Sequence, residues 1–270
     1  MIAGSSKTVW VAAGLALAAT LVFAATPQEE AFVKVWRVHV SDPTKHDAVI
    51  DACNKATALG EYLPVVKTLL AWHLLASGKQ QDAIRAFEGA LTTDRSAPTL
   101  ARHADTMARR WLTRIDHIAV DKALRTYYAA NVAFPTSLSP IFAQPNPPAK
   151  TDRFGDAWVY ETKALSSVSN TANQRFSLSS KTLGNRLTAM KAVPFTSYGK
   201  RTATIISKRA GTPVMVEFET VADGDPQRGT ASEGSAVNGI RFLKLDSDGR
   251  FALMIENEND FWVVATTRSR

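Results

Sequence analysis

Cysteine is almost absent from this chain. Cys53 is the only one in 270 residues, so no intrachain disulfide can form. The motifs of common catalytic sites are also missing: there is no Walker loop, no Rossmann glycine pattern and no Gly-x-Ser-x-Gly motif. Nucleotide binding and serine-hydrolase chemistry therefore have no sequence support. Cys53 lies in a helical pattern without a histidine motif beside it, and we interpret it as a small buried apolar residue.

The histidines do not form a recognisable ligand set. No His-Glu-x-x-His motif and no cysteine–histidine cluster occurs among His39, His46, His73, His103 and His117. A structural zinc or a zinc protease site is therefore not expected. His117 directly follows Asp116, but adjacent helical residues point in different directions, so we interpret this pair as solvated. The sequence predicts no catalytic residue, no cofactor and no metal site, and we expect the protein not to be an enzyme.

Acidic residues are missing from one long stretch. None occurs between Lys181 and Arg209, whereas acidic residues outnumber basic ones from Gly211 to Asp260. The formal net charge is +7 and the pI is about 9.6. A uniformly basic chain would favour nucleic acid or anionic lipid. This bipolar distribution instead disfavours a nucleic-acid partner.

A long uncharged run is the clearest feature that is present. Residues 8–28 carry no charge and follow Lys7. About 20 predominantly apolar residues can cross a bilayer as a helix, with the basic end in the cytoplasm. We interpret residues 1–28 as a signal anchor, which predicts a single-pass protein of the bacterial inner membrane whose C-terminal bulk is periplasmic. The alternative is a signal peptide cleaved after Ala24, because Val22 and Ala24 fit the small-residue rule.

Helical patterns follow in residues 41–96. We expect a first helix that begins at Ser41 or Asp42, with Pro43 in its first turn, and that stops at Gly60.

The stretch LPVVKTLLAWHLLASGKQQDAIRAFEGALTTD then predicts two antiparallel helices joined at residues 77–79. The spacing of Gly78, Ala83, Phe87 and Ala90 resembles a tetratricopeptide repeat. Stacks of such repeats need about three units, and one is present, so a single helical hairpin is favoured.

Residues 97–130 predict one long helix. Its apolar residues recur at steps of three and four and form one stripe. The stripe consists of Leu100, Ala104, Met107, Trp111, Ile115, Ile118 and Leu124. The basic residues Arg102, Arg109, Arg110, Arg114 and Lys122 lie largely off it. We expect the basic side chains to be solvated and the stripe to dock on a sheet.

Prolines from Pro135 to Pro148 exclude a continuing helix after this point. DAWVYETK and RFSLSSK predict two short strands, with the polar stretch ALSSVSNTANQ as a loop between them. Phe154, Trp158 and Tyr160 lie at steps of four and two positions, so in an extended strand they share one face. We expect this face to pack against the long helix, with Trp158 and Tyr160 mostly buried.

Residues 193–270 predict a small β-domain. The segments TATIIS, PVMVEFETV, GIRFLKLD, RFALMIE and FWVVATT are rich in strand-forming residues, and five strands at this spacing suggest a small barrel or sandwich. At residues 246–250, DSDGR is better explained by an Asp-Gly hairpin turn than by a calcium loop. ADGDPQRGTASEG is expected to be a solvated loop. The fold class is α+β.

Three stretches occur in a characteristic order: LRTYYAANVAFPTSLSPI, DRFGDAWVYET and FSLSSKTLG. Over residues 107–184 this order resembles the globular core of type II secretion pseudopilins, in which a long helix precedes a G-x-Y-P-T/S turn, a D-P-W-G-x-x-Y-x-Y turn and a strand ending near S-x-G. The resemblance implies a long helix packed on a small sheet, within residues 97–190. Arg153 and Phe154 depart from the family pattern. The prepilin peptidase site and the calcium-binding aspartates have no counterpart here.

The C-terminal part carries a Y-G…A-x-I pattern at Tyr198–Ile205 and an Asp-Gly hairpin turn. It more weakly resembles the periplasmic β-domains of inner-membrane assembly proteins in type II secretion and type IV pilus systems. Together the resemblances imply a membrane-anchored assembly or scaffold protein that contacts envelope proteins. The alternative is an exported soluble binding module that recognises a peptide or glycan through Trp158, Tyr160 and Trp262.

Overall fold

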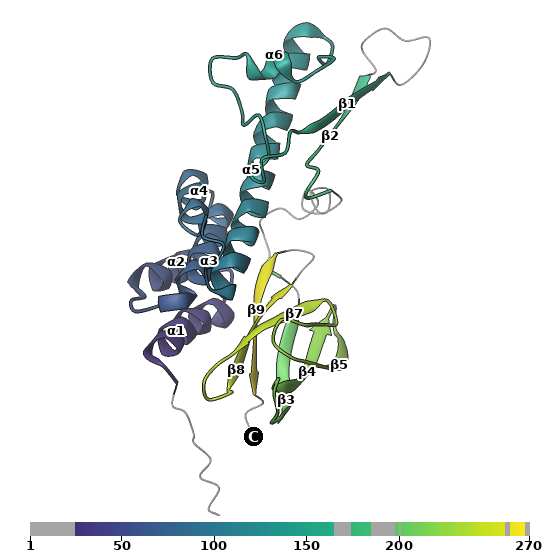
Figure 1. The fold of residues 1–270 in the computed structure, drawn as a ribbon. Coiled ribbons are helices and arrows are strands. Elements are labelled where there is room, and N and C mark those ends of the chain that lie inside the picture. Colours follow the sequence, from purple (N-terminus) through teal and green to yellow (C-terminus); the bar gives the residue numbers. More distant parts are fainter. Residues whose placement is uncertain (1–24, 165–173, 185–197, 200, 257–259, 268–270) are drawn as a thin grey trace, which may run out of the picture.

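Helices come first along the chain and most strands come last, with a narrow β-hairpin between them (Figure 1). The computed structural model describes residues 25–164, 174–184, 198–199, 201–256 and 260–267. The helices are α1 (Pro27–Ser41), α2 (His46–Lys55), the 3₁₀ helix η1 (Gly60–Tyr62), α3 (Leu63–Ala76), α4 (Gln80–Glu88), α5 (Thr99–Asn131) and α6 (Ser139–Phe142). The strands are β1 (Val159–Ala164), β2 (Gln174–Ser179), β3 (Thr202–Arg209), β4 (Met215–Ala222), β5 (Asp225–Ala231), β6 (Ala236–Val237), β7 (Ile240–Leu245), β8 (Phe251–Glu256) and β9 (Phe261–Thr267). The predicted α+β class is confirmed.

Helix α1 was not predicted, although its start carries a clear sequence signal. The Thr26 hydroxyl accepts from the Glu29 N–H at 3.2 Å, and the Glu29 carboxylate accepts from the Thr26 N–H at 2.7 Å. This capping box, with Pro27 at the first helical position, satisfies N–H groups that a helix start leaves without partners.

The prediction of one helix from Ser41 to Gly60 is wrong at both ends. Asp42 Oδ1 accepts hydrogen bonds from the N–H and the hydroxyl of Thr44, which stabilises a turn between α1 and α2. Helix α2 then ends at Lys55, and Gly60, at φ 50°, begins η1.

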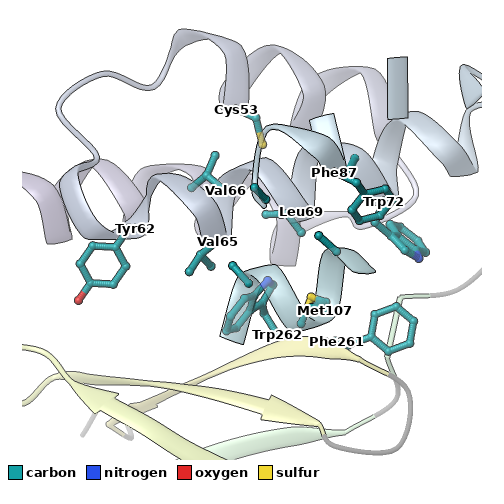
Figure 2. Close-up of a cluster of buried hydrophobic side chains, with 14 of the residues drawn as sticks. Cys53, Tyr62, Val65, Val66, Leu69, Trp72, Phe87, Met107, Phe261 and Trp262 are labelled. Atoms are coloured by element: carbon teal, nitrogen blue, oxygen red, sulfur yellow. The ribbon is translucent and has the colours of Figure 1, made fainter. Parts of the chain in front are cut away.

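Helices α3 and α4 form the predicted antiparallel hairpin, with Gly78 at φ 77° in the turn between them. Helices α1–α4 and the first half of α5 share one apolar core, which we call the main core. Figure 2 shows part of it, with Cys53 pointing in among the helices and Phe261 and Trp262 entering from the sheet. The interpretation of Cys53 as a buried apolar residue is confirmed.

Strands β3–β9 form a seven-stranded sheet in the order β5-β4-β3-β9-β8-β7-β6. Its two edge strands meet, because a Cβ atom at Gly229 in β5 would collide with the side chain of Val237 in β6. The sheet is therefore nearly closed, like a small barrel. The stretch predicted as a solvated loop, residues 222–234, instead contains β5, which pairs with β4 over its whole length. The predicted hairpin turn at residues 246–249 is confirmed, with the Gly249 N–H donating to the Asp246 carbonyl.

Strand β8 joins the barrel to the helices because both of its faces are buried. Phe251, Leu253 and Ile255 belong to the main core under the helices. Ala252 and Met254 belong to a second core inside the barrel. Alternate side chains of a strand point to opposite faces, so one strand closes two cores.

The second half of α5 carries a separate small unit, which we call the arm and define as the described residues from 120 to 184. It contains α6 and the antiparallel β1–β2 hairpin and extends away from the rest of the molecule (Figure 1). Its own core consists of Val120, Leu124, Leu138, Ile141, Trp158 and Leu178. The prediction that the long helix packs on a small two-stranded sheet is confirmed, and the predicted loop between those strands lies mainly outside the described residues.

Two details of the long helix differ from the predictions. Ile118, assigned to the apolar stripe, is 51% exposed, whereas Arg114, assigned to the solvated basic face, is 3% exposed. The Asp116–His117 pair is not solvated either, because His117 is buried and lies 3.0 Å from the Leu178 carbonyl.

Most of the uncharged run, residues 8–24, lies outside the described residues. Within the described part of the chain, no helix is long and apolar enough to span a membrane.

Candidate functional site

The stretch from Asp152 to Tyr160 is built around one buried carboxylate. Asp152 Oδ1 accepts from the N–H groups of Phe154 and Asp156 at 2.9 and 3.1 Å. Its Oδ2 accepts from the Ser180 hydroxyl at 2.6 Å. An aspartate that bonds backbone N–H groups two and four residues ahead stabilises a tight turn, and the bond to Ser180 ties this turn to the end of β2.

Arg153 fastens the same turn to the helices. Its guanidinium donates to Asp116 on α5 at 2.5 Å and to Glu88 on α4 at 3.3 Å. The Arg153 carbonyl accepts from Arg109 at 2.9 Å, and the Arg153 N–H donates to the Thr113 hydroxyl at 3.1 Å. The hydrogen bond to Asp116 is the main cause that raises the pKa of Arg153. Arg153, which departs from the pseudopilin pattern, thus connects the arm to α4 and to the first half of α5.

Trp158 and Tyr160 hold the proline-rich segment of the arm. Trp158 is 7% exposed, and its Nε1 donates to the Ala149 carbonyl at 2.8 Å. The Tyr160 hydroxyl donates to the Pro135 carbonyl at 2.7 Å. The predicted burial is confirmed for Trp158, whereas Tyr160 is half-buried. Both polar atoms already donate hydrogen bonds to backbone carbonyls of the arm, so the two side chains stabilise its fold.

Trp262 is also unsuitable as a ligand contact. It is 2% exposed, and its indole N–H donates to the Thr68 hydroxyl on α3 at 2.7 Å. The ring lies between the barrel and the helices (Figure 2). The three aromatic residues predicted to bind a peptide or glycan are not brought together, since Trp158 and Tyr160 belong to the arm and Trp262 to the main core.

A buried ion-pair cluster joins α5 to the barrel. The Asp260 carboxylate accepts from Arg110 at 2.5 Å and from Arg114 at 2.6 Å, and its carbonyl accepts from Trp111 Nε1 at 3.2 Å. The Asp260 side chain is fully buried. A buried charge needs such partners because desolvation is costly, which explains why Arg114 lies inside rather than on a solvated face.

Three histidines that are distant in the sequence form a chain of contacts where α1, α2 and α3 meet. His73 Nε2 lies 3.1 Å from His39 Nδ1, and His73 Nδ1 lies 3.0 Å from His46 Nδ1. We call this set the histidine chain. His39 and His73 are buried, whereas His46 is partly exposed at the rim. The Tyr198 ring covers the inner end, 4.4 Å from the His39 ring centroid.

The geometry of the histidine chain allows consecutive hydrogen bonds between neutral imidazole rings. A neutral imidazole has one N–H donor and one acceptor nitrogen, so His73 donates to one neighbour and accepts from the other. Its two contacts leave from opposite nitrogens of one ring, and three lone pairs therefore do not converge on one point. Consistently, no group of three or more potential ligands among the described residues could hold a metal ion.

Burial keeps the inner histidines neutral. Desolvation lowers the pKa of His39 to about 4. It also lowers the pKa of His73 to about 3, with smaller contributions from the two neighbouring histidines. No carboxylate bonds the chain among the described residues. The ionisable group in ring contact with it from the barrel side is Tyr198, whose pKa burial raises. A proton added here would have no counter-charge.

A carboxyl pair lies in the β7–β8 turn. Burial raises the pKa of Asp246, and a hydrogen bond with Asp248 adds to the increase. That same hydrogen bond lowers the pKa of Asp248. Asp246 is therefore the member of the pair that takes up a proton first as the pH falls, and its Oδ1 accepts from the Phe251 N–H at 2.8 Å. The pair closes the hairpin turn that the sequence predicted.

An open groove of about 670 Å³ runs between α1 and the barrel. Its apolar lining includes Trp36 and Val264, and its rim carries Lys34, Arg37 and Arg250. We call it the α1 groove. It has room for an extended segment or small polar group, and its rim charge is mixed because Asp248 also lines it.

Comparisons with protein-family models, with curated proteins and with solved structures return no match to this chain. Its function must therefore be argued from its own residues.

The histidine chain could not have been found from motif spacing. His39, His46 and His73 belong to three different helices, and only the packing of these helices brings their rings together. One signal was available for the region: three of the five histidines precede residue 74, in helices with a strong apolar pattern. That signal indicates burial, but it does not indicate mutual contact.

Proposed function

We propose that this protein is a non-enzymatic, membrane-anchored assembly scaffold in the periplasm, working in a type II secretion or type IV pilus-like system. The observation that carries the proposal is the two-ended arrangement along α5. The arm lies at one end and both ends of the described chain lie at the other (Figure 1). A 33-residue helix spans about 50 Å at 1.5 Å per residue.

The polar chemistry of the described residues supports this proposal. Asp152, Asp260 and the inner histidines are buried and bonded within the chain. Such groups connect the arm, the helices and the barrel. They favour a protein whose role is to hold surfaces at fixed positions, since a rigid scaffold presents its partners at a set distance.

The arm is the surface that we propose for a partner of the secretion or pilus type. Its β1–β2 hairpin has two strands, and an exposed strand edge can add a strand from another chain. Val159, at 46% exposure, points away from the arm core that holds its neighbour Trp158. The pseudopilin resemblance of residues 107–184 supports partners of this kind.

The test is recovery of envelope-assembly proteins with the full chain from membranes in mild detergent. V159D should abolish recovery without unfolding the arm, because Val159 is exposed. The matched control is L63D, which places the same charge at another exposed apolar position on α3. Recovery that is equal for both variants, or a wild-type chain that retains no envelope-assembly protein, would contradict the proposal.

The second candidate is an exported soluble module, cleaved after Ala24, that binds a peptide or glycan. The α1 groove favours it, because the groove is open and carries both apolar and charged lining. Its binding residues would then be Trp36, Arg37 and Arg250. Trp158, Tyr160 and Trp262 would have no part in binding. N-terminal sequencing of the mature protein separates the two candidates: a soluble chain that begins at Ala25 would refute the anchor.

A further inference from the structure

Both ends of the described chain lie at one end of the barrel. Ala25, Thr267 and Arg250 line the same groove, and Figure 1 shows α1 and the barrel on the side opposite the arm. The β9 end lies beside β3, because Ile205 pairs in parallel with Thr267. The uncharged run of residues 8–24 therefore joins the described chain at this end.

Specific contacts hold the loops of this end together. Glu29 at the start of α1 accepts from the Ser247 N–H at 2.9 Å and from its hydroxyl at 2.6 Å. Lys208 at the end of β3 donates to the Gly249 carbonyl at 2.7 Å. The β3–β4 and β7–β8 turns and the start of α1 thus form one surface, and we call it the basic end.

Exposed basic side chains dominate the basic end. They are Lys34, Arg37, Lys208 and Arg209. Arg250 pairs with Asp248 at 2.9 Å, so these two charges offset each other, and the carboxylates of Asp246 and Glu29 are buried. Glu30 is the exposed carboxylate of α1 on this side.

An exposed apolar side chain lies among these charges. Val214, in the β3–β4 turn, is 41% exposed and follows Lys208 and Arg209 by a few residues. An apolar residue flanked by basic residues is a common arrangement at a membrane interface, where the ring or methyl groups enter the headgroup region and the charges meet phosphates.

We propose that the basic end lies on the anionic headgroups of the membrane that holds the chain. This inference rests on the proposed anchor, since an anchor that leads directly into Ala25 brings the basic end to the lipid surface. Each basic side chain at an anionic surface strengthens attachment by about fivefold, and the effect falls within a Debye length. The contact would orient α5 so that the arm points away from the membrane.

The experiment uses the full chain in vesicles of phosphatidylcholine alone or with added phosphatidylglycerol. V214C carries a fluorophore, and a nitroxide on the lipid headgroups quenches it only at short range. Cys53 is a minor concern for labelling, because burial raises the pKa of its thiol to about 12; dye-treated wild type measures any background. The matched control is V159C, which carries the same label on the exposed face of the arm.

We expect strong quenching of the V214C label in anionic vesicles and weak quenching in phosphatidylcholine alone. Raising the salt concentration should reduce the quenching, and so should R37Q/R209Q, which removes two exposed charges. The V159C label should stay unquenched throughout. Quenching that ignores lipid charge, or that is equal at positions 214 and 159, would overturn the proposal.

Flotation and alkaline extraction of the same samples test the anchor separately. A chain that resists extraction but shows no quenching at position 214 retains the anchor and overturns the lipid contact. A chain that is extracted, yet is quenched only with anionic lipid, supports the contact and refutes the anchor. A chain that neither floats nor is quenched refutes both.

Discussion

Replacing His39 with phenylalanine should weaken the dependence of stability on pH by the equivalent of one proton. The pKa of His39 is about 4 in the folded protein, against 6.5 for an unperturbed histidine. The unfolded chain therefore binds a proton that the folded chain excludes. The contribution of neutral His39 to the free energy of unfolding is fully present above pH 6.5. It is lost as the pH falls toward 4, because protons favour the unfolded state.

The magnitude follows from the size of this shift. Each proton taken up on unfolding changes the free energy of unfolding by about 1.4 kcal/mol per pH unit. Because His39 is 3% exposed, solvent screening is small, and the whole shift corresponds to about 3 kcal/mol. His73 acts in the same direction. The buried Asp246 acts in the opposite direction, since its raised pKa lets the folded state bind a proton first.

The assay compares wild type with H39F, so that contributions from Asp246 and other groups away from the histidine chain cancel. Free energies of unfolding come from denaturant titrations of the full chain in mild detergent at several values between pH 4.5 and 7. Between about pH 4.5 and 6, the slope for H39F should be smaller than that of wild type by up to about 1.4 kcal/mol per pH unit, and above about pH 6.5 the two slopes should converge. H39Q provides a second variant if phenylalanine prevents folding, and K34Q, an exposed change on the same helix, should keep the wild-type slope. Equal slopes for wild type, H39F and H39Q would refute the reasoning that burial keeps His39 neutral.

Further outcomes follow from the other buried contacts. W158A should destabilise the arm by about 3–5 kcal/mol because it opens a cavity in a small core. The control V159A, at an exposed position, should cost less than about 0.5 kcal/mol. Hydrogen exchange of α5 and β1 measures both, and unchanged exchange in W158A would contradict the assigned packing. D260A should lower the free energy of unfolding by about 3–5 kcal/mol, because it removes the carboxylate that pairs with buried Arg114. Thermal denaturation measures the loss. A loss below about 1 kcal/mol, typical of a solvent-exposed ion pair, would contradict the burial of this pair. Cys53 should resist thiol reagents at pH 8 until the protein is denatured, since burial raises the pKa of its thiol to about 12; fast labelling of the native chain would contradict its burial.

Periodicity and turn chemistry predicted the elements that depend on local sequence. The α3–α4 hairpin, the long helix and the strands around Trp158 were all predicted, because apolar spacing and turn residues act within a few residues of one another. Helix α1 also begins with a local signal, the capping box of Thr26 and Glu29, which follows directly on the uncharged run. Strand β5 was not predicted because its polar composition resembles a loop, and pairing with β4 and closure of the barrel outweigh that propensity.

Residue spacing along single elements was enough to predict the α+β class, most helical and strand segments and the burial of Trp158. Which polar residues meet depends instead on how those elements pack. Arg114 was expected in solvent and is buried because Asp260, distant in the chain, lies opposite it. The histidines form a chain because three helices converge, and a single strand, β8, closes two cores because helices cover one face and the barrel the other. Contacts between residues far apart in sequence depend on how elements pack, and no local pattern encodes that packing.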